Sequence, residues 1–171
     1  SAFNLAMPVM KSETAAPGAL MVKLVDLKVS DALWNMVDPQ TELPRDPATL
    51  IIDLSGAIKP LIDLFDPKQA EALAAGGANS SPFEVSEAKI NQLQLKAVGA
   101  ELNGTGAVTI DNTATPPKPV GAIDLTLTGA NKLMDNLVAA GLVPEDQIMG
   151  ARMMLGLFAV PTGDDAMASK I

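Results

Sequence analysis

The sequence predicts an α+β fold, built as a curved antiparallel β-sheet with short helices packed on one face. Two observations lead to this prediction. Six segments alternate apolar with polar residues, as half-buried strands do, and four short segments carry helix start signals. The 171 residues, nearly half of them hydrophobic, fit a single domain over residues 1–171.

Alternation of apolar and polar side chains marks the predicted strands. It is clearest in the last segment, where Ile123, Leu125 and Leu127 alternate with an aspartate and two threonines. In the second segment the alternation changes phase between Lys23 and Asp26, which predicts a bulge or a strong bend there. The predicted strands fall within residues 3–9, 20–29, 50–54, 93–97, 106–110 and 123–128.

The dipeptide Asn103-Gly104 is a strong short-range signal for a β-hairpin, because both residue types tolerate the positive φ of a type I′ turn. A tight turn is therefore predicted there, pairing residues 93–98 with residues 107–110. The nearby Gly106 does not complete a dinucleotide-binding motif. No third glycine follows at the required spacing, and no helix follows the strand.

Each predicted helix begins at a residue that favours a helix N-terminus. The start residues and spans are Ser30 or Asp31 for residues 32–37, Pro67 for residues 68–75, Asn131 for residues 132–140, and Pro144 for a longer helix. In this last helix, the methionine-rich segment 148–158 is apolar on more than one face. That pattern predicts either burial against the sheet or an adaptable apolar surface that faces a lipid or a partner.

Two strand-to-helix junctions resemble each other. The segment LSGAIK at residues 54–59 has a counterpart in LTGANK at residues 127–132, and each copy continues to an aspartate. This similarity predicts repeated strand–strand–helix units. The irregular spacing of the junctions is also compatible with chance similarity.

The residue types that the chain lacks restrict its chemistry. It has no His, Cys or Tyr, which excludes the usual general base at neutral pH, thiol nucleophiles, thiolate metal sites and disulfides. The net charge of −8 disfavours nucleic-acid binding, because an acidic protein repels a phosphate backbone. We therefore expect no cofactor, no metal site and no nucleic-acid partner.

The remaining candidate catalytic groups have structural explanations. Asp63 and Asp66 precede a helix start, where capping explains them better than general acid–base catalysis. Ser86 and Lys89 have the spacing of a Ser–Lys dyad, but they precede a strand, whereas that dyad needs a serine at a helix start. The aspartates at residues 164–165 do not match a calcium loop, so a turn is predicted. We therefore predict that the chain is not an enzyme.

The sequence also suggests where the chain belongs. No segment has the run of about 20 apolar residues needed to cross a bilayer, and no signal peptide is present. Ser1 leads directly into an alternating segment, and the chain stops at Ile171 as another strand begins. We therefore expect this domain to be the C-terminal part of a longer exported protein.

Three segments carry a resemblance to a known family: LPRDPATL at residues 43–50, residues 93–111, and MGARMMLGLF at residues 149–158. They resemble a bacterial family called domain of unknown function 2125, and the last segment is the most specific. The resemblance spans most of the chain. It implies an exported protein with no established activity and no catalytic residues, with a further strand after the last helix and with the N-terminal half of the family's usual length outside this chain.

The strand–turn–strand–helix pattern is also similar to that of AsmA-like envelope proteins, which are associated with lipid handling and outer-membrane assembly. We therefore expect a periplasmic, non-enzymatic protein of the cell envelope that binds a lipid-like or other apolar ligand. Its candidate lining residues are Val108, Ile110, Ile123, Leu125 and Leu127, for which core packing is the alternative role. The alternative function is a structural or assembly module that contacts other envelope proteins through sheet edges or the methionine-rich helix.

Overall fold

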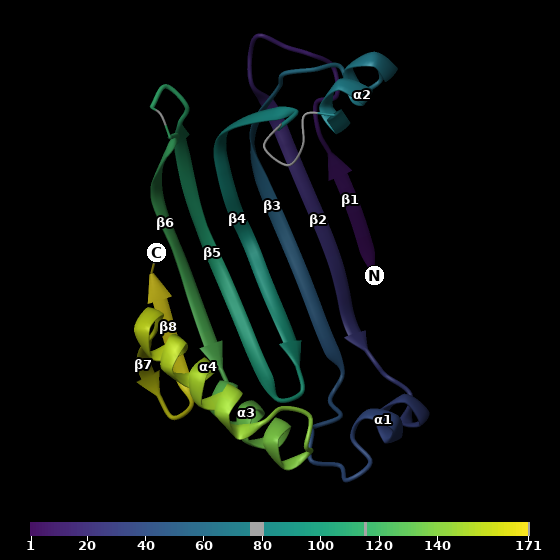
Figure 1. Cartoon of the computed structure of the whole chain (residues 1–171), viewed down its shortest axis with the longest axis vertical. Coiled ribbons are helices and arrows are strands. Elements are labelled where there is room, and N and C mark those ends of the chain that lie inside the picture. The colour runs from purple at the N-terminus through teal and green to yellow at the C-terminus, as the bar shows by residue number, and fades with distance from the viewer. Residues whose placement is uncertain (76–80, 115, 171) are drawn as a thin grey trace.

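The computed structural model describes residues 1–75, 81–114 and 116–170. Within these ranges the chain forms one eight-stranded antiparallel sheet and four helices (Figure 1). Strands that follow one another in the chain are neighbours in the sheet as far as β6. After β6 the order reverses, since β8 pairs with β6 and β7 forms the edge. The predicted α+β class and the antiparallel sheet are confirmed.

Within the described ranges, five strands are long, three are short, and the helices lie between β2 and β3, between β3 and β4, and between β6 and β7. The strands are β1 (Ala2–Ala6), β2 (Ala16–Leu27), β3 (Ala48–Pro60), β4 (Phe83–Ala97), β5 (Ala100–Asp111), β6 (Lys118–Thr128), β7 (Val160–Gly163) and β8 (Ala166–Lys170). The helices are α1 (Asp31–Val37), α2 (Pro67–Ala75), α3 (Ala130–Ala139) and α4 (Glu145–Phe158). The order of these elements does not confirm the predicted repeat of strand–strand–helix units.

The four helices occupy two kinds of position. Figure 1 shows α1 and α2 beyond opposite ends of the long strands, whereas α4 crosses in front of β6 and β8 and α3 lies at the end of the sheet next to β5. Leu127 of β6 packs against the side chains of α3 and α4. The predicted packing of helices on one face of the sheet therefore holds for α3 and α4 but not for α1 and α2.

The predicted turn at Asn103-Gly104 is wrong. Both residues lie inside β5, and the chain turns instead at Val98-Gly99, between β4 and β5. Val98 has φ 47° and Gly99 has φ 81°, as the two central residues of a type I′ turn require. A β-branched residue rarely adopts positive φ, so this turn has a weak sequence signal. Gly104 instead leaves room within the sheet for the Leu125 side chain, since a Cβ there would lie 2.7 Å from Leu125 Cδ2.

Bulges keep the apolar residues of the long strands in phase. The pairing of β3 with β4 shifts register twice, and each shift leaves one extra residue in β4, Ser86 and Asn91. Apolar positions on either side of each bulge therefore stay on one face, although strict alternation in the sequence is lost. In β2 the register shifts between Leu24 and Leu27, and Asp26 has φ 55°, which confirms the irregularity predicted there.

Strand pairing gives the sheet two different faces, because paired residues of neighbouring strands point to the same side. We name as the apolar face the side that carries rows of aliphatic residues and glycines. Three successive rows are Leu20, Leu54, Ile90, Gly106 and Ile123; Val22, Ile52, Leu93, Gly104 and Leu125; and Leu24, Leu50, Leu95, Leu102 and Leu127. The opposite side, the polar face, includes Asp53, Gln92, Gln94, Asn103 and Thr126.

Burial is greatest where α3 and α4 pack against each other and against Leu127 of β6. Ala130, Met134 and Ile148 are each 7% exposed and form one cluster. Within the described ranges, the other buried apolar side chains are those of Leu43 and Pro60. The accessible surface of 11,140 Å² also exceeds the value of about 8,000 Å² expected for a compact chain of 17.7 kDa. Most of the apolar face is therefore not covered by the residues that the structure describes.

Candidate functional site

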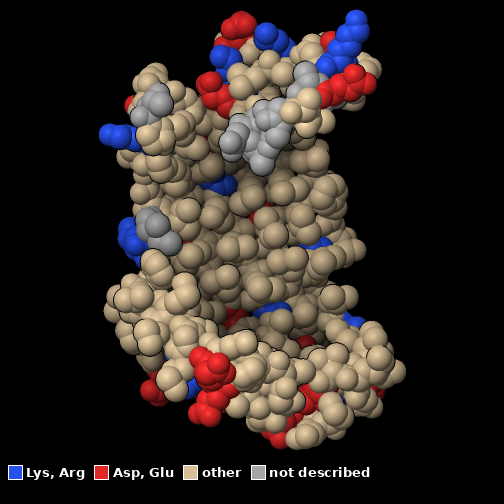
Figure 2. Space-filling model, viewed as in Figure 1, with Lys and Arg blue, Asp and Glu red and all other residues tan. Residues whose placement is uncertain are grey.

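The apolar face is the candidate functional surface. In the shared view of Figures 1 and 2, α3 and α4 lie in front of the sheet, so the apolar face is turned toward the viewer. Figure 2 shows that charged side chains gather at the two ends of the molecule, while uncharged residues dominate the surface between them. Toward β1 the exposure is large, with Phe3 67% and Leu5 57% exposed.

Small residues hollow the apolar face between β1 and β4. Gly18, Gly56 and Ala88 pair across three strands and line a depression of about 240 Å³. Larger aliphatic side chains, including Leu54 and Ile58, form its walls. A Cβ on Gly56 would clash with the backbone carbonyl oxygen of Glu87, so glycine is needed at that position. The hollow is thus a consequence of paired small residues within a strongly apolar sheet.

Two further hollows continue along the same face. One of about 280 Å³ shares Leu54 and Ala88 with the first and extends across β5 and β6. Another, also of about 280 Å³, lies between the end of the β4–β5 hairpin and α3, where Leu102 and Leu133 contribute. Each is close to the lower limit of about 300 Å³ for small-molecule sites, and none is enclosed. The face therefore offers an open apolar track rather than a deep pocket.

The structure places the predicted lining residues on this track to different degrees. Val108 and Ile123 line the second hollow, and Leu127 lines the third while also packing against α3. Leu125 and Ile110 lie on the same face, opposite Gly104 and Pro119, but line none of the three hollows. Their role in ligand binding stays a prediction.

Sequence reasoning missed the first hollow. It identified the aliphatic positions of β2 and β3 but not Gly18, Gly56 and Ala88, which lie in three separate segments. Only the register of the sheet shows that these small residues are neighbours. The available signal was glycine inside strands of otherwise large apolar residues, which indicates a place where another group approaches closely.

Polar side chains of the polar face form hydrogen bonds with one another. Asn91 Nδ2 donates to Asp53 Oδ1 at 2.9 Å and to Ser55 Oγ at 3.0 Å. Glu101 accepts hydrogen bonds from Asn103 Nδ2 at 3.0 Å and from Gln94 Nε2 at 2.9 Å. These two bonds hold the pKa of Glu101 below its usual value. No group of three or more metal-ligating side chains is found among the residues that the structure describes.

The candidate catalytic groups take the structural roles that the sequence favours. Asp63 accepts the backbone N–H of Phe65 at 3.0 Å, and Asp66 accepts that of Lys68 at 2.9 Å, at the start of α2. A hydrogen bond from the Gln69 side chain contributes most to lowering the pKa of Asp66. Ser86 lies within β4 rather than at a helix start. The geometry required for a Ser–Lys dyad is therefore absent at this serine.

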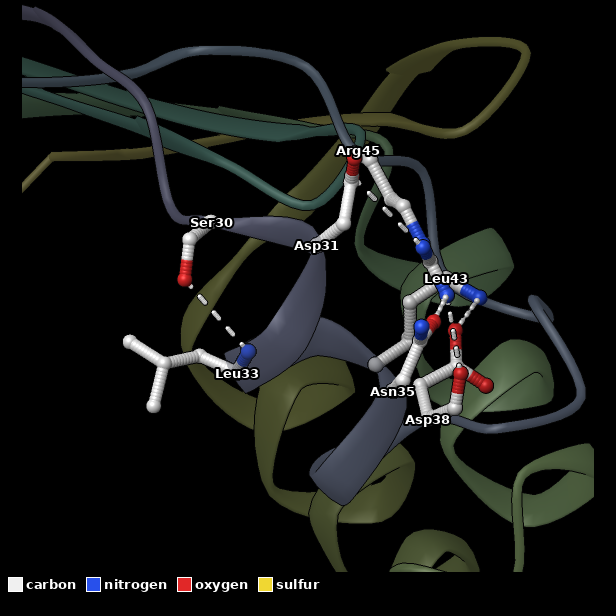
Figure 3. Close-up of polar contacts among 7 residues, drawn as sticks. All are labelled: Ser30, Asp31, Leu33, Asn35, Asp38, Leu43 and Arg45. Atoms are coloured by element: carbon white, nitrogen blue, oxygen red, sulfur yellow. Dashed lines mark hydrogen bonds and ion pairs between the residues drawn. The ribbon is translucent and has the colours of Figure 1, made fainter.

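A polar cluster fixes the loop between α1 and β3 (Figure 3). The fully buried carboxylate of Asp38 accepts the backbone N–H groups of Glu42 at 3.0 Å and Leu43 at 2.9 Å. Arg45 Nη2 donates to the Asp38 carbonyl and to Asn35 Oδ1, both at 3.1 Å. These bonds account structurally for part of the LPRDPATL segment. Its Arg45 thus helps to hold together a loop that lies beyond the end of the sheet.

Asp165 holds α3 in place from the turn between β7 and β8. Its carboxylate accepts the backbone N–H groups of Asn131 at 2.8 Å and Lys132 at 3.0 Å. The turn predicted at residues 164–165 is confirmed, whereas Asn131 is not the cap of α3, because the helix begins at Ala130. In the methionine-rich segment, Arg152 pairs with Asp135 and so ties α4 to α3.

The fold and the face together define an α+β protein with an open, amphipathic antiparallel sheet. The chain belongs to the bacterial family described as "Uncharacterized protein conserved in bacteria (DUF2125)", whose model matches residues 7–170. The resemblance drawn from the three segments is thereby confirmed. Neither the curated proteins nor the solved structures give a match. Among the described residues, none of the helices has the length and hydropathy needed to cross a membrane.

Proposed function

We propose that this chain is a non-enzymatic, periplasmic protein of the cell envelope that binds a lipid-like ligand along its apolar face. The observation that supports this proposal most is the uncovered face itself. Aliphatic rows cross strands β2 to β6, yet only the end beneath α3 and α4 is packed. A contiguous exposed apolar surface of this kind marks a binding site for a ligand, a partner or a membrane.

The dimensions suit an extended acyl chain. At about 3.3 Å per residue, the 13 residues of β3 span roughly 40 Å. An acyl chain that lies on an open face buries about half of its surface. At about half of 0.8 kcal/mol per methylene, ~12 methylenes contribute about 5 kcal/mol of binding free energy. That corresponds to a dissociation constant on the order of 0.1–1 mM for the chain alone. The ligand is therefore expected to exchange readily rather than to remain trapped.

The charge distribution favours a neutral or zwitterionic head group. The apolar track leads toward ends where charged side chains gather (Figure 2), and the chain carries a net charge of −8. An anionic head group would meet a repulsive field there. We therefore propose that zwitterionic lipids bind more tightly than anionic ones.

The proposal includes the absence of catalysis and a periplasmic location. The carboxylates of Asp63, Asp66 and Asp165 accept hydrogen bonds from backbone N–H groups. These bonds support structural rather than catalytic roles for the three residues. The periplasmic location rests on the similarity of pattern to AsmA-like envelope proteins. Fractionation of cells that express the natural protein tests the location, and screens with ester, peptide and glycoside substrates test the absence of turnover.

Binding can be tested with two matched substitutions on neighbouring strands. Ala88 and Ala107 are both exposed, but Ala88 lines two hollows of the apolar face, whereas Ala107 pairs with Lys89 on the polar face. Ala88→Phe fills the hollows, and Ala107→Phe adds the same ring to the opposite side. We expect at least fivefold weaker binding of a fluorescent acyl-chain probe to Ala88→Phe and unchanged binding to Ala107→Phe.

Lipid extraction followed by mass spectrometry complements the titration. Purified wild-type protein is expected to yield phospholipid or fatty acid. Ala88→Phe should yield less lipid, while a circular dichroism spectrum equal to that of wild type shows that the variant is folded. Recovery of no lipid, together with no binding of the probe, would overturn the proposal. Equal loss of binding in both alanine variants would place the ligand elsewhere.

The alternative function, an assembly module, has one observation in its favour. All five residues of β1 are exposed, and β1 is the first strand in the order, so its outer edge meets no neighbouring strand in the described part of the chain. Such an edge can pair with a strand of another protein. Cross-linking in intact cells distinguishes the two functions, because a stable protein partner without recovered lipid favours assembly.

A further inference from the structure

The first two hollows of the apolar face form one continuous furrow. They share Leu54, Ser55 and Ala88 among their lining residues, whereas the third hollow shares no lining residue with either. The first hollow reaches β1 through Leu5, and the second reaches β6 through Ile123. The furrow therefore crosses the strands from β1 to β6, instead of following one strand toward the third hollow.

The register of the sheet explains the direction of the furrow. One row of paired residues consists of glycine, alanine and valine and forms the floor: Gly18, Gly56, Ala88, Val108 and Gly121. The rows on its two sides carry larger aliphatic residues, which form the walls. These are Ile58 and Val85 on one side, and Leu20, Leu54, Ile90 and Ile123 on the other.

The width of the furrow admits one acyl chain. Rows on the same face lie two residues apart along a strand, so a row of small residues leaves a gap of roughly 7 Å. A polymethylene chain is about 4 Å across, which is the contact distance between carbon atoms. One chain fits, whereas two chains side by side, or an α-helix with a diameter of about 10 Å, do not.

The chemistry of the furrow favours a hydrocarbon over a peptide. The side chains of its floor and walls carry no polar atoms. Ser55, Glu87 and Lys89 border the hollows, but the register places their side chains on the polar face. An extended peptide that crosses the strands here would leave its backbone N–H and C=O groups without partners. A polymethylene chain has no such groups.

The length of the furrow limits the length of the chain. Five spacings of about 4.8 Å separate β1 from β6, which gives roughly 24 Å. An extended hydrocarbon advances about 1.25 Å per carbon, because its bonds are about 1.5 Å long with angles near 111°. The furrow therefore accommodates about 18 carbons.

We propose that the furrow is a chain-length-selective site, which holds one extended acyl chain of about 16 to 18 carbons across the strands. This inference rests on the proposed lipid-binding function and adds the direction, number and length of the bound chains. At the furrow β6 is an open edge in the described structure, since β8 pairs with residues 124–128 and not with Gly121. The head group can therefore stay in water while the chain is bound.

Two matched alanine substitutions test the direction of the chain. Ala88 lies in the floor of the furrow, and Ala97, on the same strand and face, lines the third hollow. Ala88→Phe should weaken binding of the fluorescent acyl-chain probe at least fivefold, and Ala97→Phe should leave it unchanged. A chain along the strands would run from one hollow toward the other. Equal weakening in two variants that circular dichroism shows to be folded would therefore overturn the inference.

A series of lysophosphatidylcholines tests the length on the wild-type chain, with each lipid displacing the probe below its micelle-forming concentration. Each added methylene is about half buried, so it should tighten binding about twofold up to about 18 carbons. Chains of about 20 and 22 carbons should bind no more tightly, because their ends extend beyond the furrow. Continued tightening to about 22 carbons would contradict the furrow, since a chain along β3 has roughly 40 Å available.

Failure of this inference and failure of the proposed function give different results. If the probe does not bind the wild-type chain, lipid binding itself is wrong, and the furrow has no such role. If the probe binds, but both phenylalanine variants weaken it equally or affinity keeps rising with chain length, lipid binding stands and the transverse site is wrong.

Discussion

The two ends of the apolar face differ in what covers them. At the end of β6, α3 and α4 cover the sheet, and Met134 and Ile148 are 7% exposed. Toward β1 none of the helices in the described ranges lies on the face, and Phe3 and Leu5 are 67% and 57% exposed. The strands at both ends have the same kind of aliphatic residue. Residue type therefore determines which face is apolar, while the helices determine where that face is buried.

This difference separates stability from binding within one sheet. Residues beneath α3 and α4 are expected to hold the fold, because their burial removes apolar surface from water. Residues of the uncovered part contribute less to folding and remain available to a ligand. Substitutions in the two regions should therefore act on different measurements.

The largest effect on stability is expected in the covered region. Met134→Ala removes a buried side chain at the centre of the helix–sheet cluster and leaves a cavity, which should lower the free energy of unfolding by about 3 kcal/mol. Urea denaturation followed by circular dichroism measures this. A loss below about 1 kcal/mol would show that the cluster is not the principal core.

A smaller effect is expected from the aspartate that caps α3. Burial raises the pKa of Asp165, but hydrogen bonds from the Lys132 and Asn131 backbone and the nearby Arg152 charge outweigh it, so the pKa lies below its usual value. Asp165→Ala should cost about 1 kcal/mol at neutral pH. In wild type this contribution is complete above about pH 4, near the unfolded pKa of aspartate, and is lost as the pH falls through the lower folded pKa.

The variant itself provides the control for the pH dependence. Between about pH 2.5 and 6, the difference in unfolding free energy between wild type and Asp165→Ala should shrink toward acid. A constant difference over this range would mean that the charge of Asp165 does not stabilise α3.

The smallest effect on stability is expected in the uncovered region. Leu5→Ala removes a side chain that is already 57% exposed, so the free energy of unfolding should change by less than about 1 kcal/mol. The same change enlarges and flattens the first hollow, which Leu5 lines, and should weaken binding of an acyl-chain probe. A destabilisation as large as that of Met134→Ala would remove the distinction between the two regions.

The sequence predicts the strands well where alternation is unbroken and less well where bulges or turns interrupt it. The strand predicted at residues 93–97 is the last part of β4, which begins at Phe83. The bulges at Ser86 and Asn91 shift the phase, so the first part has no regular period. The hairpin was misplaced for a related reason, since Val98 adopts a φ that its residue type rarely allows.

The candidate site was predicted in part. Val108, Ile123 and Leu127 line hollows of the apolar face, because alternation identifies residues that share a face. Alternation contains no information about which residues of different strands are paired. The hollow around Gly56 and Ala88 depends on that register, and the uncovered state of the face depends on where α3 and α4 pack.

Photolabelling with a lipid that carries a diazirine on its acyl chain tests the central claim most directly. If the uncovered apolar face binds lipid, mass spectrometry should locate the label on its strands, at residues such as Leu54, Ile90 and Ile123, and excess unlabelled lipid should remove it. Label distributed equally over both faces of the sheet, or confined to α4, would contradict a lipid site on the apolar face.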